Sequence, residues 1–537
     1  MRLKRALAVL LAAASILPMA AGCSKQTAKV DMDEIMSREN VAEYVYPEQV
    51  EIKIPVYDRG TPGQAPVTDN YWTKYVQTEF GDKHNIKVTF ISIPRKEEIT
   101  KFNQLLAGKE ENQPDIIYNY DYPSIVAFAD QGAFQILDEE MIKKYAPTFY
   151  EDTKYMDEYT YLNGEKMFLC GRRPNAYNFV TLVRKDWIEK AGYKIEDLQT
   201  REDSLNLARK IRDMKLGGEN TIAENASLAN AYFGNYGYRE YPLPEEDNAL
   251  YSDITVASLT WEPTKLTLKD MNERYNEGLI NPEWYLDKDG AKAKENFISG
   301  RAYSYGCYLT KNPDIISQLK QNVPDAEVAV LPAHNDDYFG HPGPGRADNP
   351  FGLVSGINAN CEHPEAVLMY FEWLNNHIFE MQNGIEGVTY NMEGDIPVIV
   401  DGYEGEERLN YNANKDMWCL VIEGKDLGDE ELNVKAQEET YAPDGYEHLI
   451  RQSYENYCFA KDYLYTDYIF TKPVTSLSEY AGSLLSVWQK CQVELVNCKP
   501  EEFEAKYEQA CAEYLAAGYQ EVLDEKKALY EEEKASK

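Results

Sequence analysis

Residues 325–376 read DAEVAVLPAHNDDYFGHPGPGRADNPFGLVSGINANCEHPEAVLMYFEWLNN. Two short apolar runs in this stretch, Val328–Leu331 and Phe351–Ile357, have the length and composition of strands. Between them, residues 342–345 read PGPG, which excludes a helix. After the second run, apolar residues recur at helical spacing over residues 364–374, with a proline in the first turn. This order of strand, polar loop, strand and helix indicates a chain that leaves one α/β lobe and enters another.

The first part of the chain alternates predicted strands with predicted helices. Residues 50–56 alternate apolar and polar side chains with a period of two, which is typical of a strand. Further strands are predicted at residues 86–93 and 115–118, and helical patterns follow them at residues 97–107 and 122–131. Strands that alternate with helices predict an α/β fold with a mostly parallel sheet. The length of 537 residues suggests more than one domain.

Six segments resemble, in the right order, the sugar-binding proteins that serve bacterial ABC importers. They are QPDIIYNYDYPSIVAFADQGAFQILDE (113–139), NGEKMFLCGRRPNAYNFVTLVR (163–184), FISGRAYSYGCY (297–308), the stretch 325–376, GIEGVTYNMEGDIPV (384–398) and CKPEEFEAKYEQACAEYLAAG (498–518). Their order is specific to extracellular solute-binding proteins of the maltodextrin-binding type. The resemblance implies a two-lobed periplasmic-binding-protein-like fold, in which each lobe is a mostly parallel sheet flanked by helices. Crossing hinge strands would join the lobes.

The resemblance also implies a division into domains. The expected lobes are a discontinuous N-lobe of residues 50–168 and 334–385 and a discontinuous C-lobe of residues 169–333 and 386–537. Ligands of open parallel sheets bind beyond the carboxyl ends of the strands, so two facing lobes would form a binding cleft. Two stretches, near residues 236–261 and 401–440, match no segment of the family. They are interpreted as insertions, and their function is left open.

The N-terminus has the pattern of an export signal. Three basic residues within the first five precede an apolar run at residues 6–17, and Ala20-Ala21-Gly22-Cys23 follows. Small residues before a cysteine resemble a lipobox, although Ala20 stands where leucine is usual. We expect a lipoprotein signal peptide at residues 1–22, lipidation of Cys23 and a tether at residues 23–49, with a plain secretory signal as the alternative. The protein would then be anchored by lipid at the extracytoplasmic face of a bacterial membrane.

Charge and cysteine content narrow the possible partners. The formal net charge is −36, and such a surface repels phosphate backbones, so nucleic acid is not an expected partner. Eight cysteines follow Cys23, without CxxC or Cys/His spacing, so no zinc site is predicted. We expect these cysteines to be mostly buried free thiols, although disulfide pairs are left open. Residues 287–290, DKDG, resemble a fragment of a calcium loop but lack the other ligands, so a solvated turn is favoured and a structural calcium ion stays open.

The candidate ligand-binding residues follow from strand ends and from the resemblance. A sugar ring has an apolar C–H face that a tyrosine ring can cover, and hydroxyl groups that polar side chains can bond. The chain contains 42 tyrosines. Trp261 and Trp284 are interpreted as core or loop anchors, and packing or surface turns are the alternatives for the candidates. The candidates are Tyr57, Asp58, Arg59, Asn119, Tyr120, Asp121, Arg172, Asn175, Tyr177, Tyr305, Tyr308, Glu386 and Tyr390.

The resulting hypothesis is a monomeric, lipid-anchored solute-binding protein. It would capture a carbohydrate, interpreted as an oligosaccharide, and deliver it to the transmembrane permease subunits of an ABC importer. No catalytic residues, cofactor or metal are predicted: the six histidines have no catalytic spacing, and residues 352–356 do not form a G-x-S-x-G elbow. The alternatives are a surface glycosidase or lyase, and a binding protein of the same fold for a peptide or another small solute. The identities of the sugar and of the importer are left open.

Overall fold

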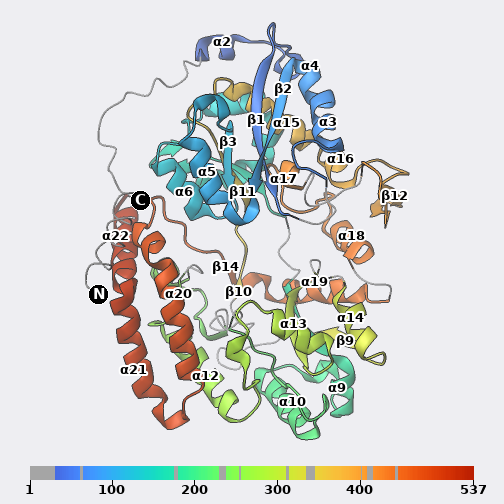
Figure 1. The fold of residues 1–537 in the computed structure, drawn as a ribbon, viewed down its shortest axis with the longest axis vertical. Coiled ribbons are helices and arrows are strands. Elements are labelled where there is room, and N and C mark those ends of the chain that lie inside the picture. The colour runs from blue at the N-terminus through green and yellow to red at the C-terminus, as the bar shows by residue number, and fades with distance from the viewer. Residues whose placement is uncertain are drawn as a thin grey trace, which may run out of the picture.

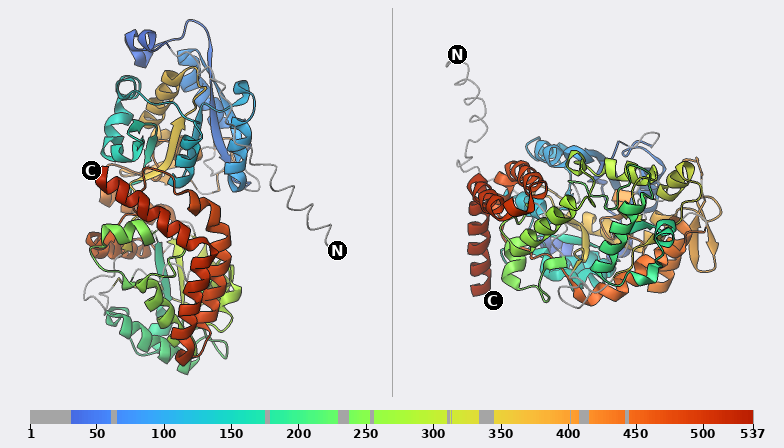
Figure 2. Two further views of the ribbon diagram at one scale, coloured as in Figure 1. Left: turned by 90° about the vertical axis from the view of Figure 1, so that its left-hand side faces the viewer. Right: turned by 90° about the horizontal axis from the view of Figure 1, so that it is seen from below.

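The computed structural model forms two lobes, which lie one above the other in Figure 1 and are called here the first (upper) and the second (lower) lobe. It describes residues 31–60, 65–174, 179–228, 237–252, 256–309, 312, 314–333, 345–400, 402–407, 415–441 and 445–536. Figure 2 shows the same division from the side, with the last three helices along one flank of the second lobe. Among the described helices, none is both long enough and apolar enough to cross a membrane.

The first lobe contains a parallel pair of strands, β1–β2, and a three-stranded sheet in the order β3–β11–β6. β1 pairs with β2 in parallel, and β11 lies antiparallel between β3 and β6. β3 follows the direction of β1, because Asp115 donates its backbone N–H to the carbonyl of Lys53 at 2.9 Å and the Tyr118 hydroxyl donates to the carbonyl of Pro55 at 2.9 Å. Four strands therefore run one way and β11 the other. They are β1 (Val50–Asp58), β2 (Ile86–Pro94), β3 (Ile116–Asn119), β6 (Leu169–Arg172) and β11 (Phe351–Ile357).

Helices and two hairpins flank this sheet (Figure 1). The helices are α3 (Tyr71–Val76), α4 (Asp82–His84), α5 (Glu98–Leu106), α6 (Tyr122–Asp130), α7 (Glu139–Tyr145), α8 (Pro147–Thr153), α15 (Pro364–Asn376), α16 (Ile378–Asn383) and α17 (Lys415–Trp418). The hairpins pair β4 (Tyr161–Leu162) with β5 (Glu165–Lys166), and β12 (Tyr390–Glu393) with β13 (Ile396–Ile399).

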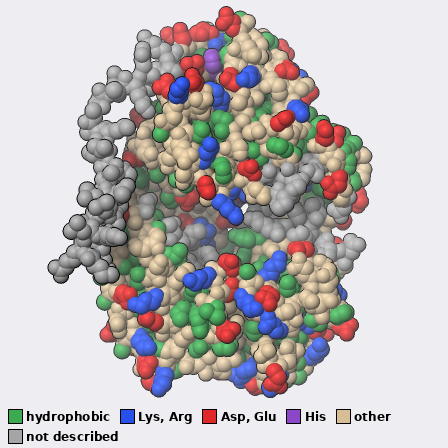
Figure 3. All heavy atoms as spheres, in the orientation of Figure 1, with side chains coloured by type: hydrophobic (Ala, Val, Ile, Leu, Met, Phe, Trp, Pro, Cys, Tyr) green, Lys and Arg blue, Asp and Glu red, His purple; other side chains and the backbone are tan. Residues whose placement is uncertain are grey.

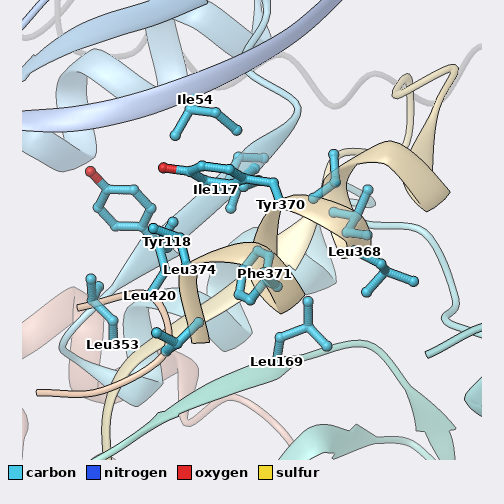
Figure 4. Close-up of a cluster of buried hydrophobic side chains, with 14 of the residues drawn as sticks. Ile54, Ile117, Tyr118, Leu169, Leu353, Leu368, Tyr370, Phe371, Leu374 and Leu420 are labelled. Carbon is cyan, nitrogen blue, oxygen red and sulfur yellow. The ribbon is translucent and has the colours of Figure 1, made fainter. Parts of the chain in front are cut away.

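Helix α15 lies at the centre of the first lobe's core. Leu368, Phe371 and Leu374 are fully buried, as their helical spacing predicts. Figure 4 shows them beside side chains from β1, β3 and β6. Tyr370 is fully buried as well, with its ring against that of Phe80. Helices α7 and α8 also pack on α15, where Phe371 meets Phe149 of α8. The helix is therefore enclosed on nearly all sides rather than on one face.

The second lobe has an antiparallel ladder at its centre. β7 lies between β8 and β9 and runs opposite to both, so the ladder differs from the mostly parallel sheet expected for this lobe. β7 is the first strand after a crossing, and β11, the first strand after the second crossing, likewise runs opposite to both of its neighbours. The strands are β7 (Phe179–Arg184), β8 (Ser304–Tyr308) and β9 (Val328–Val330).

Helices form most of the second lobe. Trp284 is fully buried against the C-terminal helices, where its indole N–H donates to Asn497 at 3.0 Å, and Trp261 is buried too, which agrees with their interpretation as anchors. The helices are α9 (Lys185–Lys190), α10 (Arg201–Met214), α11 (Glu245–Tyr251), α12 (Glu262–Asn276), α13 (Ala291–Ile298), α14 (Ile315–Asn322), α18 (Glu430–Tyr441), α19 (His448–Ala460), α20 (Thr475–Val496), α21 (Phe503–Tyr514) and α22 (Gln520–Ser536).

Three segments of the described chain cross between the lobes. The first joins β6 to β7, and the second joins β9 to β11. The third follows Ile422, which lies in the core of the first lobe, and precedes Val434, which lies in a core of the second. The second crossing carries the short strand β10 (Gly345–Arg346), which pairs in parallel with β14 (Leu464–Tyr465) at the waist of the molecule (Figure 1).

The third crossing lies directly against the first. Arg172 donates its backbone N–H to Val421 at 2.9 Å, and Glu423 donates to the carbonyl of Arg172 at 2.6 Å. Glycine at position 171 permits this approach, because a Cβ there would lie 2.6 Å from the carbonyl oxygen of Cys419. Residues 417 and 419–422 are core residues of the first lobe, whereas the sequence placed them in the second. Their apolar side chains fill the end of that core, and we propose a lobe boundary after Ile422 rather than after residue 385.

The described part of the segment expected to be a tether, residues 31–49, is attached to the first lobe at two buried side chains, Ile35 and Tyr46. It contains helix α2 (Met32–Ser37), whose Ile35 is buried. Downstream, the Tyr46 hydroxyl donates to Glu365 at 2.7 Å, and Arg38 donates to the same carboxylate at 3.1 Å. Burial by itself would raise the pKa of Glu365, but hydrogen bonds from His363 and Tyr46 outweigh burial and leave the pKa lowered. The Glu365 carboxylate thus fastens this segment to α15.

We predict that Glu365→Gln lowers the free energy of unfolding by about 2 kcal/mol at pH 7, because two of its hydrogen bonds depend on the charge. A lowered pKa in the folded state means that this stabilisation is present above the ordinary value of 4.5 and is lost as the pH falls through the folded pKa. Urea unfolding at pH 7 and at pH 4 measures the difference in the free energy of unfolding between the unsubstituted protein and Glu365→Gln. This difference should be smaller at pH 4. Glu362→Gln, an exposed neighbour, is the control. A difference that grows at pH 4 would contradict this account.

Candidate ligand-binding site

The crossing segments bring charged side chains together between the lobes. Arg173, in the first crossing, donates through Nε and Nη2 to one oxygen of Glu423 in the third, at 2.9 and 2.7 Å. Arg346, in the second crossing, donates through Nε and Nη2 to Asp467, at 2.6–2.9 Å. Asp348 lies between the two arginines, with its Oδ1 at 3.8 Å from the Nη1 atom of each. All three crossings therefore meet in one network of charges.

An exposed aromatic pair lies beside this network. Phe179 is the first residue of β7 and is 59% exposed, and its partner across the ladder is Tyr308 at the end of β8, 43% exposed. Their rings meet edge to face, with centroids 5.1 Å apart. The pKa of Tyr308 is raised, first by burial and then by Asp348, while Arg346 and Arg173 act in the opposite direction. The charges of the crossings therefore act on the Tyr308 hydroxyl.

We call Arg173, Phe179, Tyr308, Arg346, Asp348 and Glu423 the interlobe cluster. Figure 3 shows the surface hollowed at the waist between the two lobes. Two exposed rings with polar groups around them can cover the C–H face of a sugar and bond its hydroxyls. Such a position between lobes is also where ligand sites concentrate.

The structure brings three predicted site residues together around one buried carboxylate. Arg59 donates through Nη2 and Nε to Asp416 at 2.7 and 3.1 Å, and the Tyr120 hydroxyl donates to the same carboxylate at 3.0 Å. Asp416, on α17, is 1% exposed. Tyr57 is fully buried beside them, with its ring stacked on that of Tyr120. The polar atoms of Arg59 and Tyr120 hold α17 against the ends of β1 and β3.

Three further predicted residues shape the backbone at the same strand ends. The Asp58 carboxylate accepts the N–H of Gly60 at 2.9 Å. Asn119 is buried, and its side-chain oxygen accepts the N–H of Asp121 at 2.8 Å. The Asp121 carboxylate in turn caps α6 by accepting the backbone N–H of Ser124 at 3.0 Å. These local bonds give each of the three side chains a structural role.

The other predicted residues divide into three groups. Tyr308 belongs to the interlobe cluster, whereas Tyr305 is half-buried with its ring stacked on Phe297. Arg172 turns towards the first lobe, where it donates to Asn375 at 3.3 Å. Tyr390 is buried against Phe379 of α16, and Glu386 is exposed in the preceding turn. Asn175 and Tyr177 lie outside the described residues.

Five residues of the interlobe cluster were missed by the analysis of the sequence. Arg173 and Phe179 lie within the family-like segment 163–184, and Arg346 and Asp348 follow residues 342–345, PGPG. Their position in segments expected to cross between the lobes was an available signal. Glu423 lies in a stretch without family resemblance, and nothing in its local pattern points to the site.

The residues considered for metals and disulfides have structural roles. Asp287 accepts the backbone N–H groups of Gly290, Lys292 and Ala293 at 2.8–3.3 Å, so its carboxylate caps α13. Within the described ranges, no group of three or more histidine, cysteine or acidic side chains is placed to hold a metal ion. The eight described cysteines are free thiols and six of them are buried, as expected.

We predict that Asp416→Asn lowers the free energy of unfolding by about 2–3 kcal/mol, because it breaks a buried ion pair and leaves Arg59 without its bidentate partner. Asp58→Asn, at the same strand end but accepting one backbone N–H, should cost about 1 kcal/mol or less. Chemical denaturation of both variants, and of Asp416→Asn combined with Arg59→Gln, measures the coupling. Strictly additive effects in the double variant would show that the two side chains act independently.

Comparison with known proteins supports this architecture. Residues 65–377 match the model of the family described as bacterial extracellular solute-binding protein. No curated protein matches the chain.

Solved structures share the fold at low sequence identity. A protein described as an HMO-binding, ABC-transporter-associated solute-binding protein from Bifidobacterium longum infantis has a TM-score of 0.61 at 15% identity, over 90% of this chain and 99% of its own. An alginate-binding protein has a TM-score of 0.58 at 14% identity, over 91% and 99% of the two chains. An N-glycan transport solute-binding protein from Streptococcus pneumoniae has a TM-score of 0.53 at 15% identity, over 90% and 99%. These matches confirm the predicted periplasmic-binding-protein-like α/β fold.

Proposed function

The chain belongs to the bacterial extracellular solute-binding protein family, and we propose that it captures an oligosaccharide between its two lobes for delivery to an ABC importer. Membership of a family of binding proteins agrees with the prediction that it is not an enzyme. The observation that carries the proposal is the exposed Phe179–Tyr308 pair beside the charged residues of the crossings. The names of the structures with the same fold, which refer to HMO, alginate and N-glycan, support a carbohydrate as the ligand class.

Capture would proceed by closure of the lobes around the sugar. Open and closed forms of such proteins differ by a few kcal/mol, and contacts that a ligand makes only in the closed form shift the population towards it. Phe179 and Tyr308 belong to the second lobe, while Asp416, Arg59 and Tyr120 stiffen the facing surface of the first. A rigid surface on each side lets the crossings bend as the hinge.

We further propose that Cys23 carries a lipid and that the protein acts as a monomer beside the permease subunits. Only seven residues separate Cys23 from Asp31, where the described chain begins. Seven extended residues span at most about 25 Å. Since residues 35 and 46 are buried in the first lobe, a lipid at Cys23 would hold that lobe close to the membrane.

We predict that Phe179→Ala weakens oligosaccharide binding about tenfold, because it removes the exposed ring on which a sugar would stack. Isothermal titration and ligand-induced thermal stabilisation with a panel of neutral oligosaccharides measure the effect. Phe379→Ala, in α16, is the matched control. The Phe379 ring is also exposed, and it also meets a tyrosine ring, that of Tyr390, edge to face. Loss of affinity in Phe379→Ala instead would move the site to the hairpin that contains Tyr390.

The same titration separates the rival functions. Recovery of the oligosaccharide unchanged after long incubation agrees with capture, whereas release of shorter products would support a glycosidase or lyase. Thermal stabilisation of the protein by peptides, together with none by the sugars of the panel, would support a peptide-binding protein of the same fold.

A further inference from the structure

The charged groups of the interlobe cluster, counted together with Asp467, which binds Arg346, are unequal in number. Two guanidinium groups, those of Arg173 and Arg346, face three carboxylates, those of Asp348, Glu423 and Asp467. These five groups therefore carry a net charge of about −1 at neutral pH. They lie on or beside the three crossings, where a ligand between the lobes would meet them.

Both arginines are already bound by carboxylates of the protein. Arg173 uses Nε and Nη2 on Glu423, and Arg346 uses Nε and Nη2 on Asp467 with bonds as short as 2.6 Å. A carboxylate of a ligand could therefore approach each guanidinium group only from the edge that carries Nη1. Asp348 lies 3.8 Å from both Nη1 atoms, so its own negative charge would oppose a ligand carboxylate at that edge.

Among the three carboxylates of these five groups, that of Asp348 is the most exposed. Its side chain is 39% exposed, compared with 26% for Glu423 and 16% for Asp467. The distance of 3.8 Å from its Oδ1 atom to Nη1 of each arginine is longer than a hydrogen bond. Its oxygens can therefore accept hydrogen bonds from the hydroxyl groups of a sugar. An anionic group at the same place would meet a like charge instead.

From this arrangement we infer that the site selects neutral oligosaccharides over oligosaccharides that carry uronic acids, and that Asp348 determines this selection. The inference rests on the proposed capture of a sugar between the lobes and names its charge class. The net charge of −36 of the whole chain acts in the same direction, because it lowers the local concentration of anionic glycans.

The test compares matched pairs of ligands that differ in charge alone. The probes are maltotetraose, cellotetraose, mannotetraose and galactotetraose, each beside the same tetrasaccharide with its C6 hydroxymethyl groups oxidised to carboxylates. Titration of the full mature chain at low ionic strength should show at least tenfold weaker binding of the oxidised member of any pair that binds. Added salt should bring the ratio of neutral to oxidised affinity closer to one, because screening weakens the repulsion between the oxidised ligand and the protein's carboxylates.

Two variants test whether the interlobe cluster causes the preference for neutral over oxidised ligands. Asp348→Asn should narrow the ratio of neutral to oxidised affinity at least threefold, since it keeps an acceptor oxygen and removes the charge. Glu423→Gln, a second variant, should shift the ratio in the same direction because it leaves Arg173 available to an anion. Glu219→Gln changes the net charge equally at an exposed position after α10 and should leave the ratio unchanged.

The outcomes separate this inference from the function on which it rests. Equal or tighter binding of an oxidised member would overturn the inference and leave sugar capture standing. An unchanged ratio in both Asp348→Asn and Glu423→Gln would overturn the role of the cluster. If no member of any pair stabilises the folded protein, the proposed capture of an oligosaccharide fails, and the inference fails with it.

Discussion

The ion pair between Arg173 and Glu423 joins the first crossing to the third, and the arrangement of the whole site depends on it. The two segments also exchange backbone hydrogen bonds around Arg172, and a Cβ at Gly352 would lie 2.5 Å from the Cβ of Glu423, so β11 packs against the same point. Arg173 also donates its backbone N–H to the carbonyl of Pro350 at 2.8 Å, which ties the second crossing to the first. A hinge built in this way can bend as a unit without separating its strands.

The two lobes contribute differently to the space between them. The second lobe presents exposed rings, Phe179 and Tyr308, at the end of its ladder. The first lobe presents a surface whose tyrosine and arginine tips are bound to the buried carboxylate of Asp416. Exposed rings beside charged groups suit a ligand with an apolar face and a hydroxyl rim. Binding energy can then be spent on closing the lobes rather than on ordering loose side chains.

Much of the fold was predictable because it depends on local pattern. The strand at residues 351–357 and the helix after it follow from apolar spacing and from Pro364, and the order of the segments identified the family. The site was predicted less well, because it depends on contacts between distant residues. Arg59 meets Asp416 across 357 positions, and no local pattern announces that pairing. The same holds for residues 419–422, which complete the first lobe's core from an insertion without family resemblance. Tyr308 was predicted because a family-like strand ends there.

The most direct test of the account is a crystal structure of the protein with a bound oligosaccharide. The account predicts a sugar ring in contact with Phe179 and Tyr308, hydroxyls within hydrogen-bond distance of Asp348, and lobes closer together than in the protein without ligand. An oligosaccharide bound on the outer surface of one lobe, with the interlobe cluster untouched, would contradict it.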